Sequence, residues 1–417
     1  MHTTICWLSL IFVAFPAVAT EAAAGAVFKL ATFNTALLPS NVIRQYSARK
    51  EALQTALADS SADVVCLQEI WRQQDILDIA NTSRSRFPYY HSFNSMGMRG
   101  QKVPISNTAP CDVLDFLRAY TQCLNKSCLT AFSQGIAAGV SCAFVSCKLY
   151  MQSLGQYCVN CMLQADVGTS NDVTTAIQRQ CIYLPTDNYA TTHGLLLLSK
   201  YPLKKKVAAT YHPNDVVPLT RGYISAEIDG LGPVMCTHLT TEGAFPSYFG
   251  PPPFTSFEEL QTNETQQVLK AYPADREGFP PVLLGDFNHG PKSNILVGEH
   301  TVNYQLIIDA GYESPYITKV GTCTLCANNP LGGAAGSMKA DRAVDHIYVA
   351  KGSNVTNVKR IWDNKLAVNT SGEALPISDH YGVQLSYHYV YEGTSSGRIL
   401  SSSLLIAVTG IVLHGLI

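Results

Sequence analysis

The stretch Val282-Leu283-Leu284-Gly285-Asp286-Phe287-Asn288 is an apolar run that leads into two polar side chains. Short apolar runs bounded by turn residues predict buried strands, so we expect a strand over Val282–Asp286 that ends at a carboxylate. Asp286 and Asn288 are two positions apart, and in an extended chain both side chains face the same side. The alternative is a turn capped by the two side chains, because Asp and Asn both favour turns.

The same pattern, an apolar strand with a polar side chain at its end, recurs along the chain. Functional residues collect where strands meet loops, so the repetition predicts one shared pocket at an edge of the sheets. A single carboxylate or imidazole at a strand end would be ordinary, because strand ends reach solvent. The other polar strand ends are Asn34, Glu69, Thr237-His238, Asp345-His346 and Ser378-Asp379-His380.

Many short strands separated by helical runs predict a layered α/β or α+β sandwich. Helical patterns cover 48–58 and Phe257–Ala271. Further strands are predicted over Val27–Phe33, Asp63–Gln68, Gly194–Ser199, Gly222–Ile228, Pro233–His238, Val344–Ala350 and Val383–Tyr389.

Six motifs in this order resemble those of the endonuclease/exonuclease/phosphatase superfamily, which includes deoxyribonuclease I, abasic-site endonucleases, neutral sphingomyelinases and inositol polyphosphate 5-phosphatases. The resemblance covers Val27–Tyr389 apart from one insertion, and it implies a four-layer sandwich of two packed mixed β-sheets flanked by helices. The motifs are Leu30-Ala31-Thr32-Phe33-Asn34, Val65-Cys66-Leu67-Gln68-Glu69, Thr237-His238-Leu239, Gly285-Asp286-Phe287-Asn288, Arg342-Ala343-Val344-Asp345-His346 and Ser378-Asp379-His380.

The resemblance also implies a metal site built from oxygen ligands. Glu69 matches the principal ligand of the family, with help from Asn34 and Asp379. Hydrolysis of a phosphate ester needs a hard cation, and oxygen ligands suit Mg²⁺. We therefore expect Mg²⁺ as the cofactor, with Mn²⁺ as the alternative cation.

Five further residues match the catalytic positions of the family. Asp286 would orient or deprotonate the attacking water, and Asn288 would steady the nucleophile or the phosphoryl oxygens. His380 would contact the phosphate as an acid or base, oriented by Asp345, as the third group orients the imidazole in a hydrolytic triad. His238 would bind phosphate or protonate the leaving oxygen, although a lone strand histidine is more often structural.

Length and composition set outer limits. The chain has 417 residues, of which 47% are hydrophobic and only 14% charged, which excludes a disordered, collagenous or coiled-coil protein. The formal net charge is -2, whereas a dedicated nucleic-acid-binding protein usually carries an excess of positive charge. The length permits one large domain with an insertion, or two domains.

Both ends of the chain are typical of targeting segments. The apolar run Ile5–Val13 followed by Ala17-Val18-Ala19 predicts a signal peptide over residues 1–19. Ser395-Ser396-Gly397, a polar spacer and the apolar tail Leu404–Ile417 predict a removable signal for a glycosylphosphatidylinositol (GPI) anchor over 396–417. The alternatives are a transmembrane helix, for which the tail is short, and a disordered or amphipathic tail. The catalytic domain is predicted over 26–392.

Cysteine spacing agrees with export. Cys6 lies in the predicted signal, and the remainder of the 13 cysteines is an even number. Eight of them lie between Cys111 and Cys181, inside a helical insertion predicted over 104–185, and an oxidising compartment favours a disulfide framework there. Zinc at the Cys-x-x-Cys pairs is the weaker alternative, and Cys66 and Cys236 could be buried thiols or a pair. The acceptor sequons at Asn81, Asn125, Asn263, Asn354 and Asn369 predict glycosylation.

Three functions remain open at this point. The first is a secreted, GPI-anchored Mg²⁺-dependent phosphodiesterase on the extracellular face of the plasma membrane, which cleaves phospholipid head groups as neutral sphingomyelinases do. The second is an extracellular nuclease like deoxyribonuclease I, disfavoured by the low positive charge. The third is a non-enzymatic ectodomain on the same scaffold. No protein partner is predicted, and the insertion is expected to be a lid that sets substrate choice.

Overall fold

The computed structural model describes residues 26–38, 43–93, 111, 114–134, 136–164, 175, 178–182, 193–213, 220–242, 248, 250–332, 340–368 and 374–388. The predicted signal peptide and anchor signal lie outside these residues. Within them, no helix has the length and apolar character that a membrane span requires.

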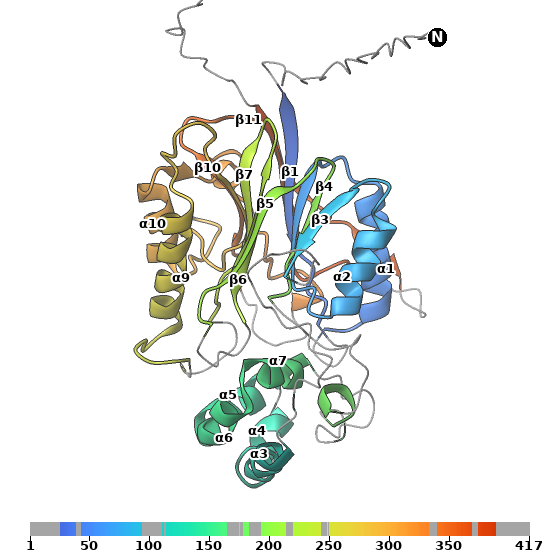
Figure 1. Ribbon diagram of the computed structural model, residues 1–417, viewed down its shortest axis with the longest axis vertical. Helices are drawn as coiled ribbons and strands as arrows, with labels where there is room; N and C mark the ends of the chain where they lie inside the picture. The colour runs from blue at the N-terminus through green and yellow to red at the C-terminus, as the bar shows by residue number, and fades with distance from the viewer. Residues whose placement is uncertain are drawn as a thin grey trace, which may run out of the picture.

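Two six-stranded mixed sheets form the centre of the molecule (Figure 1). In spatial order the first contains β11 (Asn354–Ile361), β14 (Gly382–His388), β1 (Val27–Asn34), β2 (Val64–Gln68), β4 (Leu196–Ser199) and β3 (Tyr89–Ser92). The second contains β5 (Lys204–Thr210), β6 (Gly222–Ile228), β7 (Gly232–His238), β8 (Val282–Asp286), β10 (Asp345–Ala350) and β9 (Tyr312–Glu313). The strands β12 (Lys365–Val368) and β13 (Ala374–Pro376) pair separately.

Helices cover the outer face of each sheet, which makes four layers (Figure 1). The helices on the first sheet pack their apolar sides against it in one buried cluster, and the helices on the second sheet do the same in another. The predicted four-layer sandwich is confirmed, and the predicted bounds of β8 and α9 are met to the residue. The helices are α1 (Tyr46–Ala58) and α2 (Gln73–Thr82) on the first sheet, and α9 (Phe257–Ala271) and α10 (Thr301–Asp309) on the second, with the short α11 (Pro315–Lys319) beside β10 and β11.

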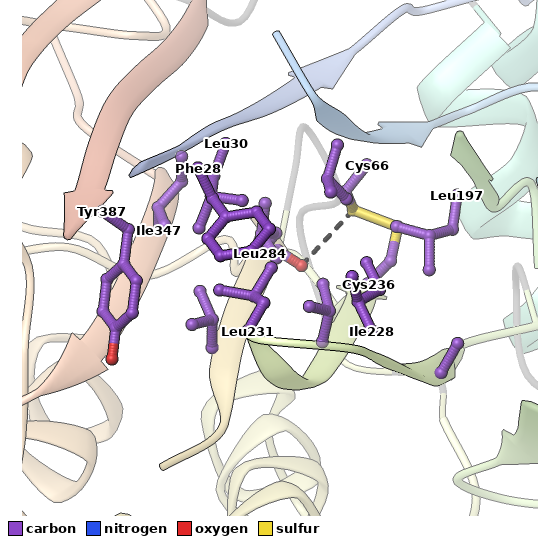
Figure 2. Packing of buried hydrophobic residues seen from close by; sticks show 14 of the residues in the cluster. Phe28, Leu30, Cys66, Leu197, Ile228, Leu231, Cys236, Leu284, Ile347 and Tyr387 are labelled. Atoms are coloured by element: carbon purple, nitrogen blue, oxygen red, sulfur yellow. Dashed lines mark hydrogen bonds between the residues drawn. A yellow bond between two sulfur atoms is a disulfide. The ribbon is translucent and has the colours of Figure 1, made fainter. Parts of the chain in front are cut away.

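The largest apolar cluster lies between the two sheets (Figure 2). Leu30 and Cys66 of the first sheet meet Cys236 and Leu284 of the second, and all four are fully buried. Cys66 and Cys236 form a disulfide, so of the two alternatives left open the pair is correct. The bond links β2 to β7 across a sequence separation of 170 residues and ties the two sheets together.

The cysteine-rich segment forms a helical unit at one end of the sandwich (Figure 1). Three nested disulfides, Cys111–Cys158, Cys123–Cys147 and Cys128–Cys142, staple its helices, and Cys161–Cys181 closes it. The expected disulfide framework is therefore present, and zinc at the Cys-x-x-Cys pairs is wrong because Cys323 and Cys326 are also disulfide-bonded. The elements are α3 (Leu114–Ser127), α4 (Leu129–Gln134), α5 (Ile136–Ser146), α6 (Lys148–Leu154), α7 (Gln156–Gln164) and the π-helix η1 (Gln178–Ile182).

Acid should weaken the folded state through buried histidines. His91 of β3 is fully buried, and its Nε2 donates to the Val207 carbonyl oxygen on β5 at 2.8 Å. Burial lowers the pKa of His91 from 6.5 to about 4. As the pH falls below 6.5, the unfolded chain therefore binds the proton first, and stability is lost progressively until the pH reaches the pKa of the folded state.

The variant His91→Gln keeps a hydrogen-bond donor but does not titrate. We expect the free energy of unfolding to fall less between pH 7 and pH 5 in this variant than in the wild type, by about 2 kcal/mol. Urea unfolding at the two pH values measures the difference. His388→Gln, at the partly exposed end of β14, serves as the control. An unchanged pH dependence in His91→Gln would show that burial of this ring is not the cause.

Candidate active site

Sheet topology brings the predicted residues to one edge. The strands β7 and β8 are parallel, with His238 opposite Asp286 at their carboxyl ends. The strand β10 runs antiparallel to β8, so its first residue, Asp345, lies opposite Asp286 as well. Asn34 ends β1, and Glu69 follows β2, the parallel neighbour of β1.

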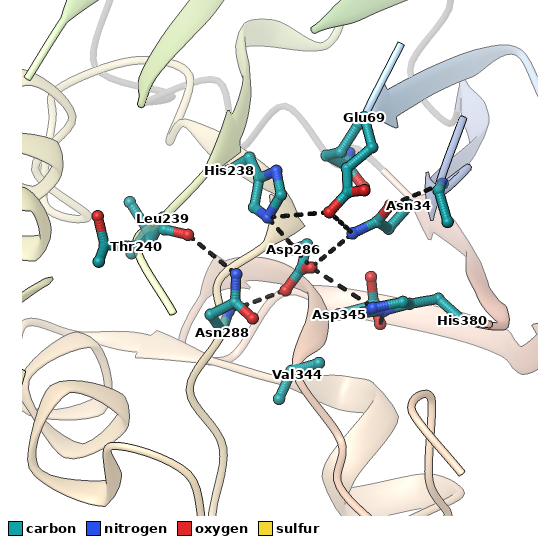
Figure 3. Close-up of polar contacts among 12 residues, drawn as sticks. Asn34, Glu69, His238, Leu239, Thr240, Asp286, Asn288, Val344, Asp345 and His380 are labelled. Atoms are coloured by element: carbon teal, nitrogen blue, oxygen red, sulfur yellow. Dashed lines mark hydrogen bonds and ion pairs between the residues drawn. The ribbon is translucent and has the colours of Figure 1, made fainter. Parts of the chain in front are cut away.

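The Asp286 carboxylate lies at the centre of this group (Figure 3). Asn34 Nδ2 donates to Asp286 Oδ2 at 2.8 Å, while His238 Nε2 and His380 Nε2 lie 3.4 Å and 3.9 Å from the same oxygen. Burial alone would raise the pKa of Asp286, but the two imidazoles and the Asn34 hydrogen bond outweigh it and lower the pKa below the ordinary value. Asp286 is therefore an anion placed between two imidazole rings.

His380 and Asp345 form a buried pair. His380 Nδ1 donates to Asp345 Oδ2 at 2.9 Å, which leaves Nε2 directed toward Asp286. Burial alone would lower the pKa of His380, yet the carboxylates of Asp345 and Asp286 raise it well above 6.5. The pair thus has the geometry of an imidazole oriented by a carboxylate.

Asn34 presents its amide nitrogen, not its oxygen, to the neighbouring carboxylates. Its Nδ2 donates to Glu69 Oε1 at 3.2 Å and to Asp286, and its Oδ1 accepts from the Ala36 amide at 3.0 Å. An amide side chain binds Mg²⁺ through its oxygen, and the Asn34 oxygen faces the Ala36 amide, so in this arrangement Asn34 orients the two carboxylates. Ligation by Asn34 itself would require the amide to turn over.

The chain after β8 turns where an extended course was predicted. Asn288 has a φ of 48°, and its amide donates to Asp286 Oδ1 at 2.9 Å. The predicted extended course from Asp286 to Asn288 is therefore wrong, and the alternative, a capped turn, is present. Asn288 still borders the pocket, with its Nδ2 donating to the Leu239 carbonyl oxygen at 2.9 Å.

A pocket of about 160 Å³ opens over these groups. Besides Glu69 and Asp286, its lining includes Asp379, which the sequence placed among the metal ligands. The oxygen-rich donor set fits a hard cation such as Mg²⁺. Asp286, Asp345 and His380 also offer ligand atoms within 4.8 Å of one another, so the described residues provide two adjoining sets of donors.

Two buried arginines near the site carry no signal in the sequence. Arg49 of α1 donates to the carbonyl oxygens of Ala36 at 2.9 Å and Ile377 at 3.2 Å, and so joins the loop after β1 to the loop that carries Asp379. Burial lowers the pKa of Arg49 to about 10. Arg221 contacts His238 at 2.6 Å. No motif marks either arginine, because each acts through contacts between segments distant in sequence.

Arg342 and Glu299 complete the rim of the pocket. Arg342 Nε lies 2.7 Å from Glu299 Oε2, and both side chains border the pocket. Burial raises the pKa of Glu299, although the Arg342 charge opposes the shift. The guanidinium thus holds the chain that leads into Asp345 against the loop after β8.

Several solved structures of known proteins are similar to this chain. Sphingomyelinase C from Streptomyces griseocarneus has 14% identity and a TM-score of 0.46, with 87% of this chain and 99% of that chain covered. The 3'-5' exonuclease NExo from Neisseria meningitidis has 16% identity and a TM-score of 0.47, covering 87% and 100%. A mutant of Staphylococcus aureus beta toxin with bound magnesium ions has 12% identity and a TM-score of 0.46, covering 87% and 99%. Similarities this low say nothing about substrate.

No curated protein matches the chain. The family model described as "Endonuclease/Exonuclease/phosphatase family" matches residues 31–380, which spans every polar strand end from Asn34 to His380. Most of the chain is covered, the intervening helical unit included. The chain therefore belongs to the endonuclease/exonuclease/phosphatase family of phosphoester hydrolases.

Proposed function

We propose that this protein is a Mg²⁺-dependent phosphodiesterase that cleaves the head groups of phospholipids. The observation that carries the hydrolytic part is the buried Asp286 carboxylate, held by Asn34 between the imidazoles of His238 and His380. A carboxylate in this position can orient a water and accept its proton, while the imidazoles can donate to phosphoryl or leaving oxygens.

Glu69 is the proposed principal ligand of the cation, assisted by Asp379 and oriented by Asn34. When bound, the cation would neutralise charge that develops on the phosphate. In this proposal the side chains of the protein position the water and supply the protons. Asp345 fixes His380 with its Nδ1 protonated, so that Nε2 faces the pocket.

A lipid substrate is favoured by the surface of the helical insertion. The unit contacts the active-site end of the sandwich, because Thr220, two residues before β6, donates its amide to Asn160 Oδ1 of α7 at 3.3 Å. Exposed apolar side chains on this unit suit contact with a lipid surface better than contact with a phosphate backbone. Among the described residues of the unit, the large exposed apolar side chains are Leu129, Val145, Leu149 and Tyr150.

We also propose that the mature protein is secreted and GPI-anchored. The described disulfides are compatible with an oxidising compartment. His388 at the end of β14 pairs with Val27, at the opposite end of β1 from Asn34. The described chain therefore ends on the first sheet at the side opposite Asn34, ahead of the proposed anchor. Release from cells by a phosphatidylinositol-specific phospholipase C tests the anchor.

Parallel assays on sphingomyelin vesicles and plasmid DNA test the proposed activity. We expect hydrolysis of sphingomyelin that requires Mg²⁺ and stops with a chelator, with little cleavage of DNA. Chelator-sensitive cleavage of DNA alone, weakened steeply by salt, would replace the lipid substrate with the nuclease alternative. Hydrolysis that persists in chelator would contradict the role of the cation.

A further inference from the structure

The two imidazoles beside Asp286 have different partners: one contacts a carboxylate and the other contacts a guanidinium. His380 Nδ1 faces the Asp345 carboxylate at 2.9 Å. His238 Nδ1 faces the Arg221 guanidinium instead, with Nη1 at 2.6 Å. Both members of the second pair are buried: Arg221 is 5% exposed and His238 is 1% exposed.

The chemistry of the guanidinium fixes the proton on His238. Arginine has only donors, so its Nη1 can bond Nδ1 only if Nδ1 carries the lone pair. The ring proton of neutral His238 must then reside on Nε2. That atom lies 3.4 Å from Asp286 Oδ2 and 4.0 Å from Glu69 Oε1, so the N–H is directed at the pocket.

Arg221 is itself held from three sides. Its carbonyl oxygen accepts from the Tyr211 amide at 3.1 Å, and its guanidinium carbon lies 5.7 Å from the centre of the Trp71 ring. The preceding residue, Thr220, bonds through both its amide and its hydroxyl to the Asn160 side chain of the helical insertion. The insertion thus holds the segment that orients an active-site imidazole.

We propose that Arg221 is a positioning residue that holds His238 as the Nε2–H tautomer, ready to donate a hydrogen bond to the leaving oxygen of the phosphoester. The catalytic part of this inference rests on the proposed hydrolysis. The tautomer does not, because it follows from the pairing of Arg221 with His238. The tautomer of His238 and the effect of Arg221 on activity can therefore be measured in separate experiments.

The ring nitrogens of His238 report the tautomer directly. In wild-type protein labelled with ¹⁵N-histidine, with the signals assigned by their loss in His238→Gln, we expect a protonated Nε2 and an unprotonated Nδ1. Arg221→Lys should keep this state, since the ammonium also only donates, whereas Arg221→Met should lose it. A protonated Nδ1 in the wild type would overturn the proposal, whether or not the protein hydrolyses any substrate tested.

Kinetics test the catalytic part. With methyl aryl phosphate diesters, Arg221→Met should lower kcat by about 10²-fold for a phenoxide leaving group and less for 4-nitrophenoxide, which needs less help to depart. KM should stay nearly constant, and Arg221→Lys should recover most of the rate. Arg276→Met, a matched change at a half-exposed arginine paired with Glu227, should act like the wild type. Equal losses for both leaving groups, or a loss only in KM, would contradict the assignment.

Discussion

Asp286→Asn should lower kcat for phosphodiester hydrolysis by about 10³-fold, the largest effect of any single substitution in the site. The amide has nearly the shape of the carboxylate and can still accept from Asn34, which donates to Asp286 Oδ2 at 2.8 Å. It cannot accept a proton from water, and it leaves His380 without one of the three carboxylates that raise its pKa. Steady-state kinetics at saturating Mg²⁺ measure the loss.

Two controls separate chemistry from folding in this experiment. Asp229→Asn removes a carboxylate that pairs with Lys204 at the surface, and it should leave kcat unchanged. The midpoint of thermal unfolding of Asp286→Asn should show that the variant is folded. If a folded Asp286→Asn keeps more than about a tenth of the wild-type rate, Asp286 does not activate the water.

The fold could be predicted because its main signals are local. Val282–Asp286 is recognised as a strand from its own apolar residues, and Phe257–Ala271 is recognised as a helix from its own spacing of apolar residues. Both elements form with the predicted bounds. The motifs then gave the order of the polar strand ends. The pairing of β8 with β7 on one side and β10 on the other turns that order into proximity, since it sets His238 and Asp345 opposite Asp286.

The orientation of the site could not be predicted, because it depends on contacts between distant segments. The turn at Asn288 follows from its bond to Asp286, and the direction of the Asn34 amide follows from the Ala36 amide. Arg221 lies directly before β6, and only the folded chain shows that it meets His238. A residue that acts through another side chain leaves no local pattern in the sequence.

Glu69→Gln should abolish most of the stabilisation that Mg²⁺ gives to the folded protein. Glu69 lines the pocket from a left-handed backbone position, with φ 60°, and its Oε1 accepts from Asn34 at 3.2 Å. Gln keeps the shape but removes the charge that a hard cation needs. At a concentration 100 times the dissociation constant, Mg²⁺ stabilises the wild type by about 2.7 kcal/mol, and a 100-fold weaker site would retain only about 0.4 kcal/mol.

Urea unfolding with and without Mg²⁺ measures this loss without any substrate, so it tests the metal site even if the substrate is misassigned. Hydrolysis at the same Mg²⁺ concentration should fall in parallel, because the ligand and the reaction share one site. Glu227→Gln, at a surface carboxylate paired with Lys205, should respond to Mg²⁺ as the wild type does. Equal stabilisation of Glu69→Gln and the wild type would move the cation to the Asp286, Asp345 and His380 group, whose ligand atoms lie within 4.8 Å of one another.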